Sequence, residues 1–230
     1  MYKPKLILVG EGHVGKTSII QQFIEQKFSE SYLMTVGSDK SIKDLKINGK
    51  DIKLEIWDTA GQDKYRGVNK IFMKNTKIAL LVYDITEKYT FEQLKFWIDN
   101  VKEINKNENI IFGVAANKSD LFEQQVVETE EGKKFANDNN CLFFETSAKD
   151  YKSIENAFSK LAENYIEKIE KKNNETNNNN INNNSNNINN NQNSQNKSEG
   201  KKDLNFENEL NEKFIDKDDG KSSCSKCFIF

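Results

Sequence analysis

The feature that constrains this chain most is a glycine-rich stretch near its N-terminus, Gly10–Thr17, which reads GEGHVGKT. It follows an apolar run typical of a buried strand, Leu6–Val9, and precedes a helical pattern over Ser18–Ile24. In a strand–turn–helix unit with this spacing, glycines let the backbone approach a phosphate, and amides of the turn and helix N-terminus bind it. Lys16 is then expected to reach the outer phosphates, and the Thr17 hydroxyl to bind Mg²⁺. The stretch is therefore predicted to be a P-loop rather than an ordinary strand-to-helix turn.

Composition limits what the rest of the chain can be. The 230 residues suffice for one domain of ordinary size and an extension. Residues 173–230 hold 7 of the 34 basic and 9 of the 36 acidic side chains, so the body is neutral and no nucleic-acid partner is expected. The cysteines at 141, 224 and 227 form no disulfide or zinc framework, which fits a reducing compartment. Neither a signal peptide nor an apolar run of the roughly 18 residues that span a bilayer is expected.

Apolar periodicity predicts strands alternating with helices. The expected strands cover residues 6–9, 41–47, 51–57, 78–83, 110–116 and 141–145, and the expected helices cover 16–26, 91–104, 129–137 and 153–169. Residues 28–40 are expected to form a loop. The Asn48-Gly49 turn joins two strands that must be antiparallel. The predicted fold is α/β, with a mostly parallel six-stranded sheet, one antiparallel edge strand and helices on both faces.

Polar loops follow three of the expected strands, at the end of the sheet where ligands of α/β proteins bind. They are Asp58–Gln62, Asn117–Asp120 and Thr146–Lys149. With the P-loop, these motifs resemble in order and spacing those of the small GTPases of the Ras superfamily, over residues 5–170. Within the superfamily the chain is most similar to the Rab branch, through Lys53–Gln62 (KLEIWDTAGQ) and Leu81–Thr86 (LVYDIT).

The resemblance implies a P-loop GTPase fold and a molecular switch that binds GTP or GDP with Mg²⁺. It implies GTP hydrolysis, an exchange factor, an activating protein, and effectors that bind the GTP form. The chain is expected to act as a monomer.

The resemblance assigns recognition of the guanine base to the later loops. Asp120 would accept hydrogen bonds from both guanine N1–H and the exocyclic amine, a pairing that adenine cannot offer. Asn117 would contact the base edge and brace the P-loop, and the Lys118 stem would lie along the ring. The Ala148 amide would contact the guanine O6, and Phe28 would stack on the base. The expected nucleotide-binding residues are Gly10, Gly12, His13, Val14, Gly15, Lys16, Thr17, Ser18, Phe28, Thr35, Gly61, Asn117, Lys118, Asp120, Ser147, Ala148 and Lys149.

Metal binding and hydrolysis are assigned in the same way to residues around the P-loop. The expected metal-binding residues are Thr17, Thr35 and Asp58, with Asp58 acting through water. The expected catalytic residues are Lys16 and Gln62, and Gln62 would orient the attacking water.

Two loops are expected to respond to hydrolysis. Contacts of Thr35 and of the Gly61 amide depend on the γ-phosphate, so both loops would relax when it is lost. Arg66 is the only arginine of the chain and lies just after Gln62, with none near Thr35. Unassisted hydrolysis is therefore expected to be slow, on the order of 10⁻⁴ to 10⁻³ s⁻¹, until a partner supplies the missing charge.

Two points stay open. His13, the only histidine, is either a tolerated residue at the lip of the P-loop or a pH-sensitive contact near the phosphates. Val36–Lys40 and Asp63–Val68 differ from the usual Rab residues at positions that partners read, so specific Rab effectors are not inferred.

The C-terminal part has a different character. From Asn173 to Asn196, 16 of 24 residues are asparagine, too polar a segment to bury a core. The expected division is a small GTPase domain over 1–171, a disordered tail over 172–223 and a prenylation signal over 224–230. The last four residues, CFIF, form a C-a-a-X box that favours a geranylgeranyl group on Cys227, and Cys224 is a candidate for a second lipid. The expected location is the cytoplasmic face of an endomembrane or of the plasma membrane.

Three functions are weighed against these observations. The leading one is a membrane-tethered Rab-like switch in vesicle traffic, and the second is a Ras-like signalling switch, which the C-a-a-X ending favours. The third is a nucleotide kinase or ATPase with the same P-loop, against which Asn117–Asp120 argues.

Overall fold

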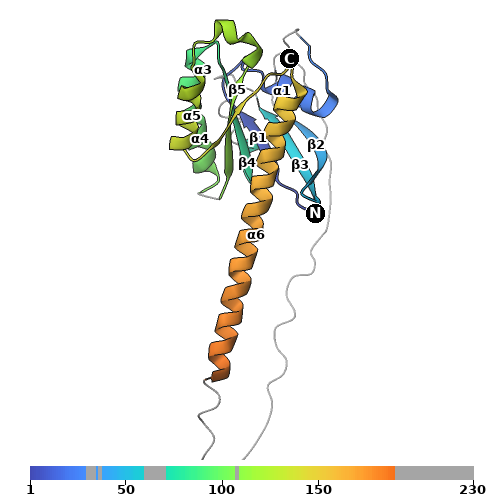
Figure 1. Cartoon of the computed structure of the whole chain (residues 1–230), viewed down its shortest axis with the longest axis vertical. Helices are drawn as coiled ribbons and strands as arrows, with labels where there is room; N and C mark the ends of the chain where they lie inside the picture. The colour runs from blue at the N-terminus through green and yellow to red at the C-terminus, as the bar shows by residue number, and fades with distance from the viewer. Residues whose placement is uncertain (30–34, 36–37, 60–70, 107–108, 190–230) are drawn as a thin grey trace, which may run out of the picture. The chain divides into compact units, whose positions relative to one another are not determined.

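One mixed sheet organises the part of the chain described by the structure, a computed structural model covering residues 1–29, 35, 38–59, 71–106 and 109–189 (Figure 1). Within these residues six strands lie in the order β2-β3-β1-β4-β5-β6. The β2–β3 pair is antiparallel and the other pairs are parallel, which confirms the predicted sheet. The strands are β1 (Lys5–Val9), β2 (Ser38–Ile47), β3 (Lys50–Thr59), β4 (Ile78–Asp84), β5 (Ile111–Asn117) and β6 (Leu142–Glu145).

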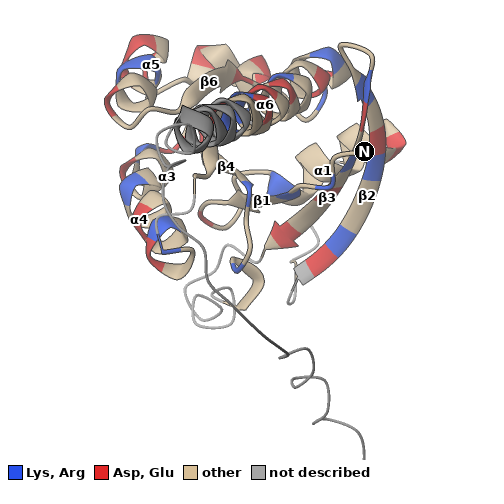
Figure 2. Cartoon of the chain, turned by 90° about the horizontal axis from the view of Figure 1, so that it is seen from below, with Lys and Arg blue, Asp and Glu red and all other residues tan. Residues whose placement is uncertain are grey.

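The β2–β3 hairpin is longer than predicted, and the expected loop over 28–40 is wrong for its last three residues. β2 begins at Ser38 because Ser38 pairs with Thr59 and Asp39 with Asp58, so the antiparallel ladder continues to the end of β3. Extending both strands together pairs backbone groups that a loop would leave to water. β2 also carries charges of both signs along the sheet edge (Figure 2), which discourages pairing with another strand.

Helices cover both faces of the sheet, as predicted. They are α1 (Lys16–Glu25), α3 (Lys88–Glu92), α4 (Leu94–Ile104), α5 (Thr129–Asp138), α6 (Tyr151–Asn189) and the 3₁₀ segment η2 (Ser119–Gln124). The helix expected over 91–104 starts earlier and is interrupted at Gln93, between α3 and α4. Its predicted apolar face nevertheless stays continuous, because Phe91, Leu94, Trp97, Ile98 and Val101 are all buried.

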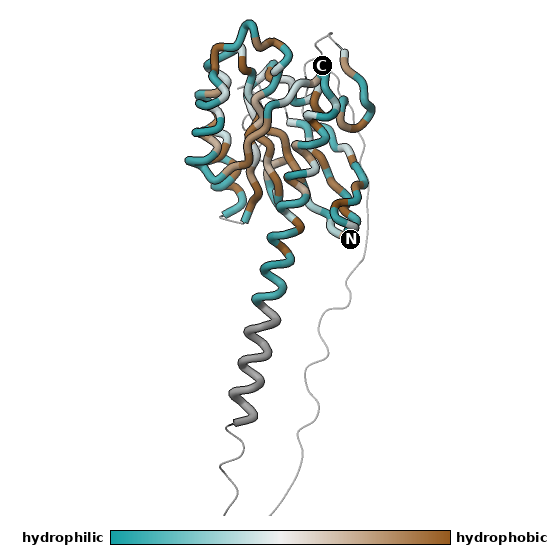
Figure 3. Tube along the Cα trace, viewed as in Figure 1, coloured by the Kyte–Doolittle hydropathy of each residue, from teal (hydrophilic) through white to brown (hydrophobic). Residues whose placement is uncertain are grey.

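Strand side chains alternate between two core clusters. Leu6 and Leu8 of β1 face α1 and α6, whereas Ile7 and Val9 face α3, α4 and α5. On the first face the rings of Phe23 and Phe158 stack with centroids 4.1 Å apart. Figure 3 shows the apolar residues gathered in the strands between the helical layers. This two-sided core holds the strand ends, and hence the site, in fixed positions.

The last helix, α6, runs past its expected end at residue 169. It packs on the sheet as far as Ile166. Asn48 Nδ2 of the hairpin turn donates to Glu163 Oε1 at 2.8 Å, and Tyr2 Oη of the N-terminal segment, which lies beside β3, donates to Glu170 Oε1 at 2.8 Å. It then continues to Asn189, into the segment expected to be disordered. A helix that is already nucleated extends at little cost because each added residue contributes a hydrogen bond.

Contacts group residues 1–183 into one compact unit. The helix α6 runs through the expected domain boundary at residue 171. The division into domains stays a prediction. Within the described part of the chain, no helix is both long and apolar enough to cross a bilayer. Residues 190–230, with Cys224 and Cys227, lie outside the described residues.

Candidate nucleotide-binding site

The predicted P-loop connects β1 to α1 and surrounds one side chain. Lys16 Nζ donates to the carbonyl oxygens of Gly10 at 2.9 Å and Glu11 at 2.7 Å. Gly10 has φ 148°, and a Cβ there would lie 2.2 Å from the carbonyl oxygen of Val82. Only glycine fits this position, so close packing of the loop against β4 sets its path.

The Lys16 ammonium is the most strongly perturbed group of the loop. The residue is only 5% exposed, and burial lowers its pKa to about 8, although Asp58 and Glu11 act in the opposite direction. A buried cation is costly unless an anion neutralises it. The loop is therefore suited to a phosphate chain, which offers such an anion at the N-terminus of α1.

The three predicted metal-binding residues lie together. Thr17 Oγ1 is 2.7 Å from Thr35 Oγ1 and donates to Asp58 Oδ2 at 2.6 Å, and Thr35 Oγ1 lies 3.4 Å from the same oxygen. Burial raises the pKa of Asp58, against the lowering effects of the Thr17 hydroxyl and the Lys16 charge. Its second oxygen, Oδ1, is buried without a hydrogen-bond partner among the described residues. An all-oxygen cluster with an unsatisfied carboxylate oxygen fits Mg²⁺ and the water molecules that it retains.

Asn117 ties the base loops to the P-loop. The residue is fully buried at the end of β5, where its Nδ2 donates to the carbonyl oxygen of Val14 at 2.7 Å and its Oδ1 accepts from Thr146 Oγ1 at 3.2 Å. A Cβ on Gly15 would lie 2.5 Å from Nδ2. The bracing contact predicted for Asn117 is thus present, and Gly15 is needed for it.

Asp120, the predicted base-reading carboxylate, is already oriented by its neighbours. Burial raises its pKa, but hydrogen bonds from Ser147 Oγ at 2.6 Å and its own backbone, with the charge of Lys149, together lower the pKa below its usual value. Lys149 Nζ lies 3.4 Å from Asp120 Oδ2 and 5.5 Å from the ring centroid of Phe28. The predicted base-binding residues therefore gather on one side of the site, with Asp120 ionised and able to accept two hydrogen bonds.

Comparison with known proteins identifies the family to which this geometry belongs. The Ras family model matches residues 5–167. The chain belongs to the Ras family. It is 40% identical over 170 residues to Ras-related protein RabQ of Dictyostelium discoideum, covering 74% of this chain and 83% of RabQ. It is 37% identical over 166 residues to Ras-related protein Rab-2B of the same organism, covering 72% and 82%. The predicted resemblance is confirmed: this is a Rab-like small GTPase.

The structure of this Rab-like GTPase leaves part of the predicted site undescribed. Gly61, Gln62 and Arg66 lie outside the described residues. His13 is exposed at the lip of the P-loop with φ 65°, and whether it acts as a pH-sensitive contact stays a prediction. Ala148 is 7% exposed, directly after the buried Ser147. Lys118 adopts φ 63° beside Asn117.

Two buried carboxylates near the nucleotide site were not among the predicted site residues. Glu11 is 7% exposed and accepts a hydrogen bond from the Trp97 indole Nε1 at 3.0 Å, which links the P-loop to α4. Asp84 is 5% exposed and forms an ion pair with Lys118. Its sequence signal was present, because an acidic residue ends the fully apolar β4 at the edge where the other site residues lie.

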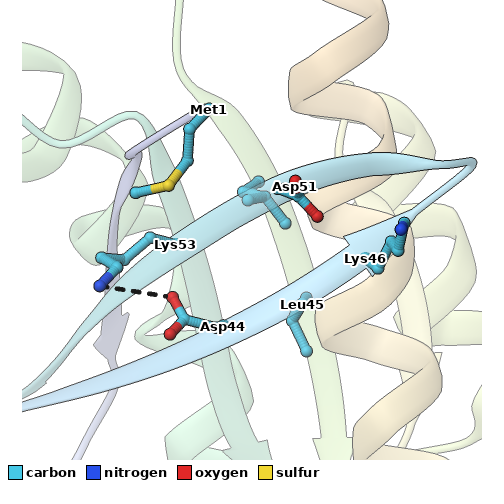
Figure 4. Close-up of a pocket in the computed structure, with 7 residues that line it drawn as sticks. Met1, Asp44, Leu45, Lys46, Asp51 and Lys53 are labelled. Carbon is cyan, nitrogen blue, oxygen red and sulfur yellow. Dashed lines mark ion pairs between the residues drawn. The ribbon is translucent and has the colours of Figure 1, made fainter.

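A surface hollow of about 430 Å³ lies elsewhere on the GTPase, at the β2–β3 hairpin (Figure 4). Across it, Lys53 and Asp44 form an ion pair of 3.6 Å. None of the predicted nucleotide or metal residues lines it, so it is separate from the candidate site. Its lining residues are Met1, Asp44, Leu45, Lys46, Asp51, Ile52 and Lys53.

Proposed function

We propose that this protein is a membrane-tethered switch in vesicle traffic that hydrolyses GTP slowly and recruits effectors in its GTP form. One observation carries the proposal: the hydroxyls of Thr17 and Thr35 and the carboxylate of Asp58 lie within hydrogen-bond reach of one another beside the buried Lys16. This arrangement joins a phosphate-binding lysine to a metal-binding cluster that includes a residue from a separate loop. It supports a site that responds to the number of phosphates present.

Different described residues would bind the phosphates, the base and the metal ion. The P-loop amides and Lys16 would hold the phosphates, while Asp120 would read the guanine base and Asn117 would keep the two halves of the site in register. Thr17, Thr35 and Asp58 would hold Mg²⁺, which when bound neutralises charge on the β- and γ-phosphates.

The remaining roles concern hydrolysis. Gln62 would orient the attacking water. Arg66 is the only arginine in the sequence, and no arginine lies near Thr35 to stabilise the transition-state charge from within the chain. An activating protein would supply that charge, and its absence makes the intrinsic rate low.

Single-turnover hydrolysis by the purified full chain tests the chemistry. The expected rate is about 10⁻⁴ to 10⁻³ s⁻¹, and a rate of about 0.1 s⁻¹ without a partner would refute slow hydrolysis. A competition measurement tests the base assignment. If ATP displaced GTP as effectively as GDP does, the guanine assignment would be overturned and a kinase or ATPase would be favoured.

The membrane part of the proposal rests on the C-a-a-X sequence at residues 227–230. A tagged full chain is expected on a cytoplasmic membrane face, and a Cys227→Ser variant in the cytosol. Unmodified Cys227 in the native protein, measured by mass spectrometry, would contradict prenylation. A location confined to the plasma membrane would support the second candidate, a Ras-like signalling switch, which the C-a-a-X ending favours.

A further inference from the structure

The carboxylate of Asp84 is held by its own part of the chain. Oδ1 accepts from the Thr86 amide at 2.9 Å and from Thr86 Oγ1 at 2.7 Å. The Asp84 amide donates to Thr90 Oγ1 at 3.0 Å, which anchors the backbone to the start of α3. These bonds leave the second oxygen, Oδ2, to pair with Lys118 Nζ. Contacts within residues 84–90 therefore fix the orientation of the carboxylate independently of Lys118.

The partner of this carboxylate belongs to the base-binding loop. β4 and β5 are parallel neighbours, and their register places Asp84 beside Asn117. The Ile85 amide also donates to the Asn117 carbonyl oxygen at 3.1 Å, so the two strand ends are joined on both sides of Asp84. The Asp84 side chain is 7% exposed, whereas that of Lys118 is 32% exposed.

A lysine side chain has several rotatable bonds and loses considerable freedom when it is ordered. The Lys118 side chain keeps about one-third of its surface in solvent, and its ion pair with the largely buried Asp84 carboxylate fixes where its ammonium lies. A pair in which one partner is buried is sensitive to loss of the other, because the remaining charge is left uncompensated.

We infer that Asp84 is a positioning residue of the base site, and that its carboxylate holds the Lys118 side chain along the plane where the guanine ring binds. The inference rests on the proposed function, because it assigns Asp84 to the same nucleotide site. Asp84 acts through Lys118 and need not touch the nucleotide.

The test measures dissociation of a fluorescent GDP, N-methylanthraniloyl-GDP, from the full chain with Mg²⁺ present. Asp84→Asn keeps the shape and an acceptor for Thr86 but removes the charge, and it is expected to speed dissociation about tenfold, or about 1.4 kcal/mol. Thr86→Val is the matched control: it removes one donor to the same carboxylate but keeps the charge, and is expected to change the rate less than threefold (about 0.6 kcal/mol).

A double-mutant cycle separates positioning from a structural role. Lys118→Met alone is expected to speed dissociation, and adding Asp84→Asn to it is expected to change the rate less than twofold, because the partner is gone. A full tenfold effect of Asp84→Asn in the Lys118→Met background would overturn the inference, and so would a single-variant rate within twofold of wild type. If Asp84→Asn does not fold, Asp84→Glu, which keeps the charge but displaces it, enters the same cycle with the same criterion. Wild-type protein that binds no guanine nucleotide would overturn the proposed function as well.

Discussion

Replacing Asn117 with alanine tests how far the fold and the nucleotide site depend on one another. The change removes the donor to the Val14 carbonyl and the acceptor for the Thr146 hydroxyl, and both stranded groups belong to residues that are 0% and 1% exposed. A buried polar group without a partner costs about 1–3 kcal/mol, so the two together predict a loss of about 3 kcal/mol in the free energy of unfolding. Against a typical total of about 5–15 kcal/mol, this is a large fraction.

Urea unfolding of the GDP-bound protein measures that loss, and fluorescent-GDP release measures the effect on the P-loop. Since Asn117 holds the carbonyl of Val14, release is expected to accelerate about a hundredfold, equivalent to about 2.7 kcal/mol. Thr146→Val is the matched control: it removes only the longer bond of 3.2 Å and is expected to cost about 1 kcal/mol. Asn117→Ala that destabilises the fold but leaves GDP release unchanged would refute the coupling. If Asn117→Ala and Thr146→Val lowered the free energy of unfolding equally, the larger part of the loss could not be assigned to the hydrogen bond with Val14.

Three further predictions concern other parts of the site. Thr35→Val is expected to weaken GTP binding about tenfold and GDP binding less than threefold, with Thr35→Ser close to wild type, measured by competition titration; equal losses for both nucleotides would contradict a γ-phosphate-dependent role. Trp97→Phe, which removes the indole donor to the Glu11 carboxylate, is expected to lower the free energy of unfolding in urea by about 1–3 kcal/mol. Glu11→Gln keeps an acceptor for the indole and is expected to cost less; the reverse order would show that this hydrogen bond does not carry the effect. Because burial lowers the Lys16 pKa from 10.5 to about 8, the unfolded chain binds more protons between these values, so stability of the nucleotide-free protein rises with pH across that window. GDP affinity should fall over the same window as the ammonium is lost, and Lys16→Met should remove both trends; a flat profile in the wild type would count against the buried ammonium.

The sequence predicted the elements well where a local pattern specifies them. The apolar run at residues 78–83 and the Asn48-Gly49 turn each have one structural interpretation, and both are confirmed. The order of strands and the start of β2 at Ser38 depend on pairing between distant segments, which periodicity does not report. The α6 extension to Asn189 was missed because asparagine-rich composition argues against a helix, whereas propagation from a packed helix favours one.

The site shows the same division between local and distant information. Thr17, Asp58 and Asn117 were identified because each belongs to a short motif with a known spacing, and the structure brings them to one edge of the sheet. Glu11 has no such motif, since its partner Trp97 is 86 residues away and the bond exists only once α4 packs on the sheet. Asp84 differs in part: its position at the end of the apolar β4 was visible in the sequence, but its ion-pair partner Lys118 follows the neighbouring strand β5.

The helix α6 also extends the compact unit beyond the sheet. It starts beside the base loops and runs to the other end of the sheet, where Glu170 accepts a hydrogen bond from Tyr2 of the N-terminal segment. An α-helix rises about 1.5 Å per residue, so the stretch from Glu170 to Asn183 adds about 20 Å of stiff length to the compact unit. A flexible chain limits the distance between its ends but not their direction, whereas a helix fixes both. The compact unit therefore has a straight projection at the end of the sheet opposite its nucleotide site, and this projection sets the direction in which the chain leaves the domain at Asn183.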